Sequence, residues 1–206
     1  MKKILIIASI LQFSILSFGQ FGYGLTASTN IYDRYTNPKD AGDAYRSAGA
    51  FFPNIGVGPK IWMGGQNMSL SLEAQAGLSV FALALKDYKG MGAVQFPILA
   101  KLNFNGLSGL DKEGRLGFTI GGGIQFTRTE LYGLRESFEL AGTKRTLFPT
   151  YIAQVGYGFG LSGFCLNAFG RFGYNPDTKA NNLSVGIQYD FNFNLLKKIA
   201  TPASSL

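Results

Sequence analysis

Two features of this sequence could carry chemistry, a glycine motif and a lone thiol. Residues 158–163 have the spacing GxGxxG, which binds a dinucleotide when a helix follows it. The next residues, 164–174, alternate with the period of a strand instead, so we expect no nucleotide site. Cys165 is the single cysteine, and the chain has no histidine to act as its base. We therefore predict that the protein is not an enzyme and holds no cofactor or metal.

A third set of candidate residues consists of charged side chains within apolar segments. Alternation places all six on the face opposite the apolar row: Lys60, Glu73, Lys101, Arg115, Arg171 and Asp190. If this face is an interior, the charges must be paired and hydrogen-bonded. The spacing predicts a cluster of Lys60, Glu73 and Lys101, with Arg115 and Asp190 at similar depth. Two interpretations are open, a selectivity ring in a narrow pore or a structural network that fills a closed lumen.

The elements that must position these charges are strands. Apolar residues recur at every second position in eight segments, which is the periodicity of a strand with two different faces. No segment has helical periodicity. The segments cover about residues 21–30, 54–61, 68–80, 94–104, 116–126, 150–160, 164–174 and 183–193.

The connections between these segments alternate in length. Short turns are expected at 64–67 and 160–163, whereas 31–52 and 127–149 are long and charged. Short turns on one side and long loops on the other are typical of outer-membrane barrels. We therefore predict an all-β protein, a closed eight-stranded antiparallel transmembrane β-barrel with up-and-down meander topology. Both termini are expected on the short-turn, periplasmic side.

Alternation alone does not decide which face is inside. A soluble barrel such as a lipocalin directs its apolar face inward, and a membrane barrel directs it outward. The polar face here consists mostly of Gly, Ser, Thr, Gln and Asn, and only 15% of the chain is charged, against about 25% in ordinary soluble domains. Small polar side chains suit the narrow interior of eight strands. This favours a membrane barrel, with a secreted lipocalin-like carrier as an alternative.

The N-terminus has the layout of a secretory signal peptide. A short basic region is followed by an apolar run over residues 4–18, and Ser17 and Gly19 precede a predicted cleavage site before Gln20. We expect a signal peptide at 1–19, an outer-membrane β-barrel at 20–194 and a short periplasmic tail at 195–206. The predicted location is the cell outer membrane.

The predicted loops 31–52 and 127–149 mix both signs of charge with Tyr and Arg. Such loops form either a protein-partner surface or solvated contacts with lipid head groups. The net charge of +7 is spread over loops and lumen without a stripe, so we predict no nucleic-acid partner. Membrane lipid is the expected partner, and the chain is expected to be a monomer.

Two segments carry a family resemblance. Residues 94–102 (VQFPILAKL) resemble the fourth strand of the outer-membrane β-barrel protein family that includes PorT-like and OmpX- or OmpA-like small barrels. Residues 187–193 (IQYDFNF) resemble the aromatic-rich final strand by which the barrel-assembly machinery recognises its clients. The resemblance implies an outer-membrane location, eight antiparallel strands and no catalysis, and PorT-like members are linked to a secretion apparatus.

The expected function is that of an integral outer-membrane barrel with a largely plugged lumen. Its role would be structural or interactive, through the extracellular loops, with a secretion-apparatus link as in PorT-like proteins. The main alternative is a narrow porin-like channel for small solutes.

Overall fold

The structure, a computed structural model, describes residues 20–38, 47–50, 54–65, 67–83, 91–109, 115–132, 146–161 and 163–193. Within them the chain forms ten strands: β1 (Gln20–Thr36), β2 (Ser47–Ala50), β3 (Asn54–Gly64), β4 (Met68–Ala74), β5 (Ala76–Leu83), β6 (Met91–Asn105), β7 (Leu116–Tyr132), β8 (Phe148–Leu161), β9 (Phe164–Tyr174) and β10 (Asn181–Asn192). In this part of the chain no helix is long and apolar enough to cross a membrane.

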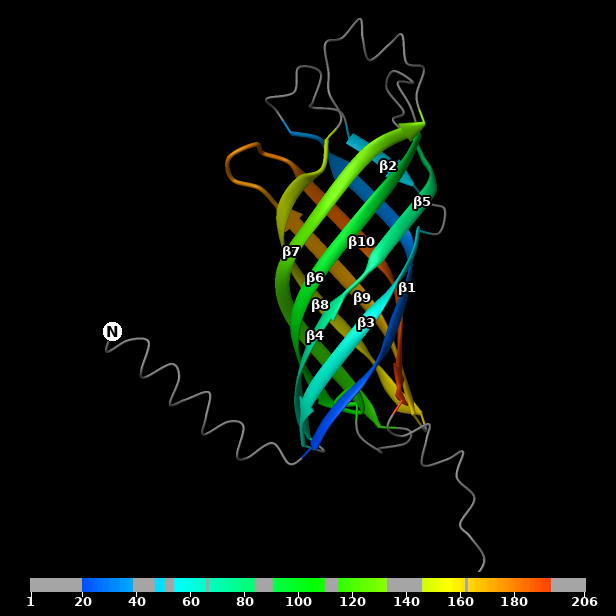
Figure 1. The fold of residues 1–206 in the computed structure, drawn as a ribbon, viewed down its shortest axis with the longest axis vertical. Helices are drawn as coiled ribbons and strands as arrows, with labels where there is room; N and C mark the ends of the chain where they lie inside the picture. Colours follow the sequence, from blue (N-terminus) through cyan, green and yellow to red (C-terminus); the bar gives the residue numbers. More distant parts are fainter. Residues whose placement is uncertain are drawn as a thin grey trace, which may run out of the picture.

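The strands pair with their sequence neighbours in antiparallel register, and the sheet closes on itself (Figure 1). Closure occurs at β1, which pairs with β10 on one side (Leu25 opposite Phe191) and with β3 on the other (Leu25 opposite Pro59). The ten strands fill eight positions in the ring. β4 and β5 share one position between β3 and β6, and β2 pairs with β1 and β5 as an extension of β3. The predicted eight-stranded antiparallel barrel is confirmed.

One interrupted position shows how the ring stays continuous. Gln75 separates β4 from β5, yet its backbone N–H donates to the Pro97 carbonyl oxygen at 2.9 Å. Pro97 has no N–H of its own to give to the ladder. The Gln75 bond therefore keeps β6 attached to its neighbour where the regular pairing is broken.

The two ends of the barrel differ in their connections. Gln20 pairs with Gly64, and the Asn192 N–H donates to the Gly163 carbonyl oxygen, so the first and last strands meet the short turns at one end. We call this the short-turn end, at the bottom of Figure 1, and the opposite end the loop-side end. The predicted signal peptide (1–19) and C-terminal tail (195–206) lie outside the described residues, apart from the predicted cleavage point at Gln20.

The strands at the loop-side end are longer than predicted. β1 continues to Thr36 and β7 to Tyr132, whereas the sequence pattern predicts loops that begin at 31 and 127. Thr127 and Thr129 are buried inside the barrel there, so the alternation of inward and outward residues continues beyond the predicted end of β7. Much of both predicted loops, including 39–46 and 133–145, lies outside the described residues.

Candidate functional site

The outer face of the barrel is apolar. In β4, the exposed residues Leu70 and Leu72 alternate with the buried residues Ser69, Ser71 and Glu73, and the described side chains of the other long strands repeat this pattern. Aromatic rings pair across strands near the short-turn end: Tyr23 with Phe193, Phe104 with Phe118, and Phe164 with Phe191.

This distribution is the reverse of that in a soluble carrier. Soluble monomers rarely expose a continuous apolar patch larger than a few hundred Å², whereas a barrel in lipid presents an apolar band with aromatic girdles. The lipocalin-like alternative requires an apolar interior, and the interior here is polar.

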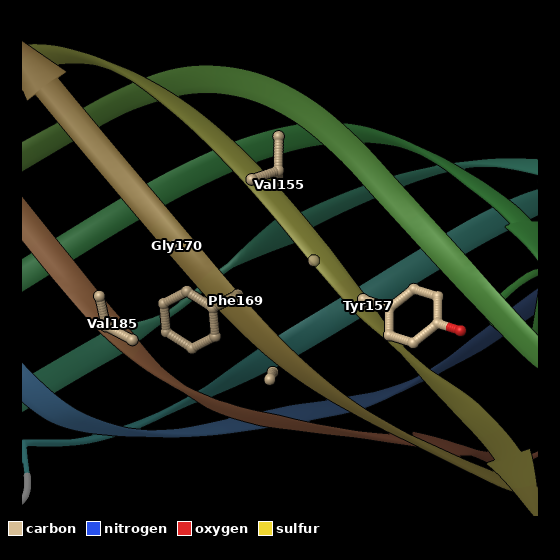
Figure 2. A pocket seen from close by; sticks show the side chains of 7 residues that line it. Val155, Tyr157, Phe169, Gly170 and Val185 are labelled. Carbon is tan, nitrogen blue, oxygen red and sulfur yellow. The ribbon is translucent and has the colours of Figure 1, made fainter.

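Hollows interrupt the outer face of the described strands where outward side chains are small. One of about 440 Å³ lies over β8, β9 and β10 and is shown in Figure 2. Gly170 lies between Val155 and Val185, and no atom lies within 4 Å of the place where its Cβ would be. A second hollow of about 290 Å³ surrounds Ala100. Both hollows are lined mainly by apolar atoms, so they are shaped to take apolar groups.

Four of the six predicted site residues meet inside the barrel, nearer the short-turn end. Lys60 Nζ lies 2.6 Å from Asp190 Oδ2, and Lys101 Nζ lies 2.8 Å from Glu73 Oε1. The first ion pair joins β3 to β10, which lie on either side of β1, and the second joins the neighbouring strands β4 and β6. The predicted contact between Glu73 and Lys101 is therefore present, whereas Lys60 bonds to Asp190 rather than to Glu73.

Gln188 connects the two ion pairs. Its Nε2 donates to Glu73 Oε2 at 3.0 Å and to Asp190 Oδ1 at 2.8 Å, and its Oε1 accepts from Lys101 Nζ at 3.1 Å. We call Lys60, Glu73, Lys101, Gln188 and Asp190 the lower network. Alternation indicates that Gln188 faces inward, but nothing in the sequence distinguishes it from the other inward glutamines.

Arg171 lies in the next layer of the interior. Its Nε donates to Gln154 Oε1 at 2.8 Å and its Nη1 to Gln125 Oε1 at 3.3 Å, and the guanidinium carbon lies 5.1 Å from the centre of the Phe169 ring. No carboxylate in the described part of the chain lies within salt-bridge distance of it. Its charge is therefore held by neutral amide oxygens and an aromatic face.

The prediction that Arg115 joins this network is wrong. Arg115 precedes Leu116, the first residue of β7, and its side chain is exposed. Alternation applies only within a paired strand, and the pairing of β7 with β6 begins at Gly117, opposite Asn105. The residue therefore lies at the rim of the short-turn end.

A further interior charge, Asp33, lies in a stretch that the sequence pattern predicts as a loop. Its carboxylate accepts hydrogen bonds from Asn30 Nδ2 (2.9 and 3.0 Å) and Asn54 Nδ2 (3.2 Å), and the residue is buried. The pairing with β10 shifts between Asn30 and Tyr32. This bulge reverses the alternation, so odd-numbered residues face inward beyond it. The sequence carries no signal for that reversal.

The interior charges in the described part of the chain balance. Three cations, Lys60, Lys101 and Arg171, accompany three carboxylates, Asp33, Glu73 and Asp190, and all six are buried. A neutral set avoids the large cost of an uncompensated buried charge. The arrangement is therefore compatible with a packed interior as well as with a pore lining.

The turn after β6 folds back into the short-turn end. Leu107 and Ser108 are only 3% and 1% exposed. Asn192 Nδ2 donates to the Gly109 carbonyl oxygen, and Cys165 Sγ lies 3.7 Å from the Gly106 carbonyl oxygen. We call residues 105–109 the inner turn.

Trp62 packs beside the inner turn. The indole is buried, it occupies the space where a side chain at Gly22 would lie, and it packs closely against Gly109. Only a residue without a Cβ leaves room for the ring at Gly22, where a Cβ would lie 2.2 Å from it.

A side-chain hydrogen bond also joins two strands at the loop-side end. Thr129 Oγ1 donates to Asn37 Oδ1 at 2.8 Å. Thr129 belongs to β7 and Asn37 follows β1, and these strands are four positions apart in the ring of eight. The hydrogen bond therefore crosses the mouth of the barrel.

Comparisons with known proteins give only distant likenesses. No family model matches the sequence, and no curated protein matches it. Among solved structures, Ail of Yersinia pestis is 11% identical with a TM-score of 0.46, covering 82% of this chain and 99% of that one. Neisserial surface protein A is 12% identical with a TM-score of 0.45, covering 84% and 97%. The N-terminal β-barrel domain of OprF from Pseudomonas aeruginosa is 12% identical with a TM-score of 0.44, covering 84% and 100%. The fold assignment rests on the strand pairing itself.

Proposed function

We propose that this chain is an integral outer-membrane β-barrel with a closed lumen, acting structurally or through interactions at its loop-side end. The observation that carries the proposal is the polarity of the wall, with an apolar outer face around a buried and charge-balanced polar interior. In lipid every backbone polar group must be paired internally, which a closed sheet achieves. The predicted signal peptide would bring such a chain to the outer membrane.

Three features support a lumen closed to solutes. The lower network spans the interior between β3, β4, β6 and β10. The inner turn and Trp62 fill the short-turn end. The bond from Thr129 to Asn37 crosses the other end.

The remaining functional predictions belong to the same proposal. Without histidine, and with its buried charges paired or bonded to amides, the chain is proposed to have no catalytic activity. Interaction through the loops and the link to a secretion apparatus stay predictions, the latter resting on the resemblance of residues 94–102. Monomeric state is part of the proposal.

Gel mobility tests the proposal directly. Folded outer-membrane barrels resist SDS until heated, because a closed ladder leaves no edge strand to open. We expect the full-length protein from the membrane fraction to migrate differently before and after boiling in SDS. A protein recovered without detergent from the soluble fraction, with the same mobility in both samples, would contradict the proposal.

A narrow channel is the second candidate, favoured by the concentration of charge on the lumen side. The two functions differ in conductance. We expect the protein reconstituted in planar bilayers to show no steady openings, with protein-free detergent as the control. Steady openings with ion selectivity would favour the channel and contradict the closed lumen, while leaving the barrel itself in place.

A further inference from the structure

Two arginines interrupt the apolar exterior at the loop-side end. Arg34 in β1 and Arg128 in β7 are exposed, and each lies between buried inward residues: Asp33 and Tyr35 in one strand, Thr127 and Thr129 in the other. Neither arginine has an ion-pair partner among the residues that the structure describes. Within this part of the chain, both guanidinium groups therefore face outward without a carboxylate to bind.

The outward positions below both arginines carry no charge. In β7 these are Leu116, Phe118, Ile120, Gly122, Ile124 and Phe126, and in β1 they begin with Phe21, Tyr23 and Leu25. Each arginine is thus the first charge met on the outer face when its strand is followed from the short-turn end.

The two arginines stand at the same height above the aromatic pairs. Arg128 is ten residues beyond Phe118, and Arg34 is eleven residues beyond Tyr23, one of which is taken up by the bulge in β1. At about 3.4 Å per residue and a tilt of about 45°, ten residues climb roughly 24 Å. The apolar band of an outer-membrane barrel is about 25 Å tall. The arginines therefore lie where the apolar band gives way to head groups.

The two arginines also lie on opposite sides of the barrel. β1 and β7 are four positions apart in the ring of eight, whichever way it is followed. A single small ligand therefore cannot contact both, whereas lipids that surround the barrel can reach each of them.

We propose that Arg34 and Arg128 each bind the phosphate of a surrounding lipid at the loop-side edge of the apolar band. A guanidinium offers a planar pair of donors that fits a phosphate, and its stem can lie along apolar surface. The proposal rests on the proposed membrane function, since it requires lipid around the barrel. To that function the proposal adds a phosphate-bearing lipid head group as the ligand and two separate binding sites for it.

Lys179 provides a matched control at the same end. It lies in the turn between β9 and β10, is exposed, and its Nζ already donates to the Pro176 carbonyl oxygen at 2.5 Å. Asp177 in the same turn carries the opposite charge. Lys179→Gln removes one positive charge, as Arg34→Gln does. It leaves Arg34 and Arg128, the two outward cations without an ion-pair partner among the described residues, in place.

Native mass spectrometry of the full-length refolded barrel in detergent tests the proposal, with dioleoyl phosphatidic acid as probe. Dioleoylglycerol, which has the same chains and no phosphate, is the reference ligand. We expect two tightly bound phosphatidic acid molecules on the wild type, one on either single Arg→Gln variant and none on the double variant. At each substituted position the dissociation constant for phosphatidic acid should rise about fivefold or more, so that this lipid is no longer tightly bound. This is the effect of about one cation near an anionic lipid surface. Lys179→Gln should bind as the wild type does.

Two results would overturn this inference. One is equal binding of phosphatidic acid by the wild type and the double variant. The other is an equal loss in Lys179→Gln, which would mean that binding follows net charge rather than these two sites. Both results are compatible with a normal heat-dependent gel shift in every variant, so they leave the proposed function in place. An absent gel shift in the wild type would instead remove the membrane function and this inference with it.

Discussion

Replacing Ile98 by arginine should destabilise the barrel in lipid far more than an arginine placed at the edge of the apolar band. Ile98 is the central residue of β6, is 41% exposed, and pairs with Ala74 and Ile124, which are also apolar. An arginine near the bilayer midplane costs about 2–4 kcal/mol in a transmembrane barrel. We expect the free energy of unfolding to fall by about this amount, together with slower insertion into vesicles.

Urea titration in phosphatidylcholine vesicles, followed by unboiled gel mobility, measures this loss. Asn181→Arg is the depth control, because Asn181 begins β10 at the loop-side end and pairs with Tyr174. Near the interface the same side chain costs only about 0–1 kcal/mol. Equal losses at both positions would mean that the apolar band is not embedded in lipid.

Removing the Lys101 charge should produce the largest loss from inside the barrel. Lys101 and Glu73 are both 1% exposed, and their side chains are 2.8 Å apart. In Lys101→Met, Glu73 keeps its bonds from Gln188 and Gln75 but loses its cation. Breaking one partner of a buried ion pair costs about 3–5 kcal/mol, because the other charge remains buried. We expect a loss of unfolding free energy in this range.

The double variant Lys101→Met with Glu73→Gln separates charge from packing. Because it removes both charges of the pair, we expect it to recover most of the stability lost in the single variant under the same urea titration. Exposed Lys179→Met is the control and should change the unfolding free energy by no more than about 0.5 kcal/mol. A double variant no more stable than the single one would show that lost packing, not the unpaired carboxylate, causes the effect.

These two positions test opposite faces of one wall. Ile98 faces outward and Lys101, three residues further along β6, faces inward. A loss of stability in Ile98→Arg that occurs only in lipid would support the lipid-facing exterior. A loss in Lys101→Met that is caused by the unpaired charge would support the charge-paired interior. Under the proposed function, partners would bind at the loop-side end.

Alternation in the sequence is sufficient to predict the fold. Successive strand residues face opposite sides of a sheet, so the apolar row in each of eight segments shows which residues share a face. An even number of such segments with short and long connections predicts a meander that closes. The same reasoning places Lys60, Glu73, Lys101, Arg171 and Asp190 on one face, and the structure buries all five.

Alternation of apolar and polar residues does not predict departures from regular pairing. The bulge after Asn30 reverses the faces of β1 and brings Asp33 inside. The paired part of β7 begins only after Arg115, which leaves that residue exposed. Both depend on where the pairing with a neighbouring strand begins or shifts, which the residue pattern of one strand does not show.

The sequence by itself determined the eight positions of the ring and, where pairing is regular, the residues that share each face, because successive side chains of a strand point to opposite sides of the sheet. Only the tertiary structure decided which face is enclosed and which residues bond across the interior. Gln188 joins Glu73 and Lys101 from distant parts of the chain, and the inner turn fills one end beside Trp62. The physical reason is that closure brings the inward side chains of different strands within bonding distance. These contacts across the interior do not exist until the ring is formed.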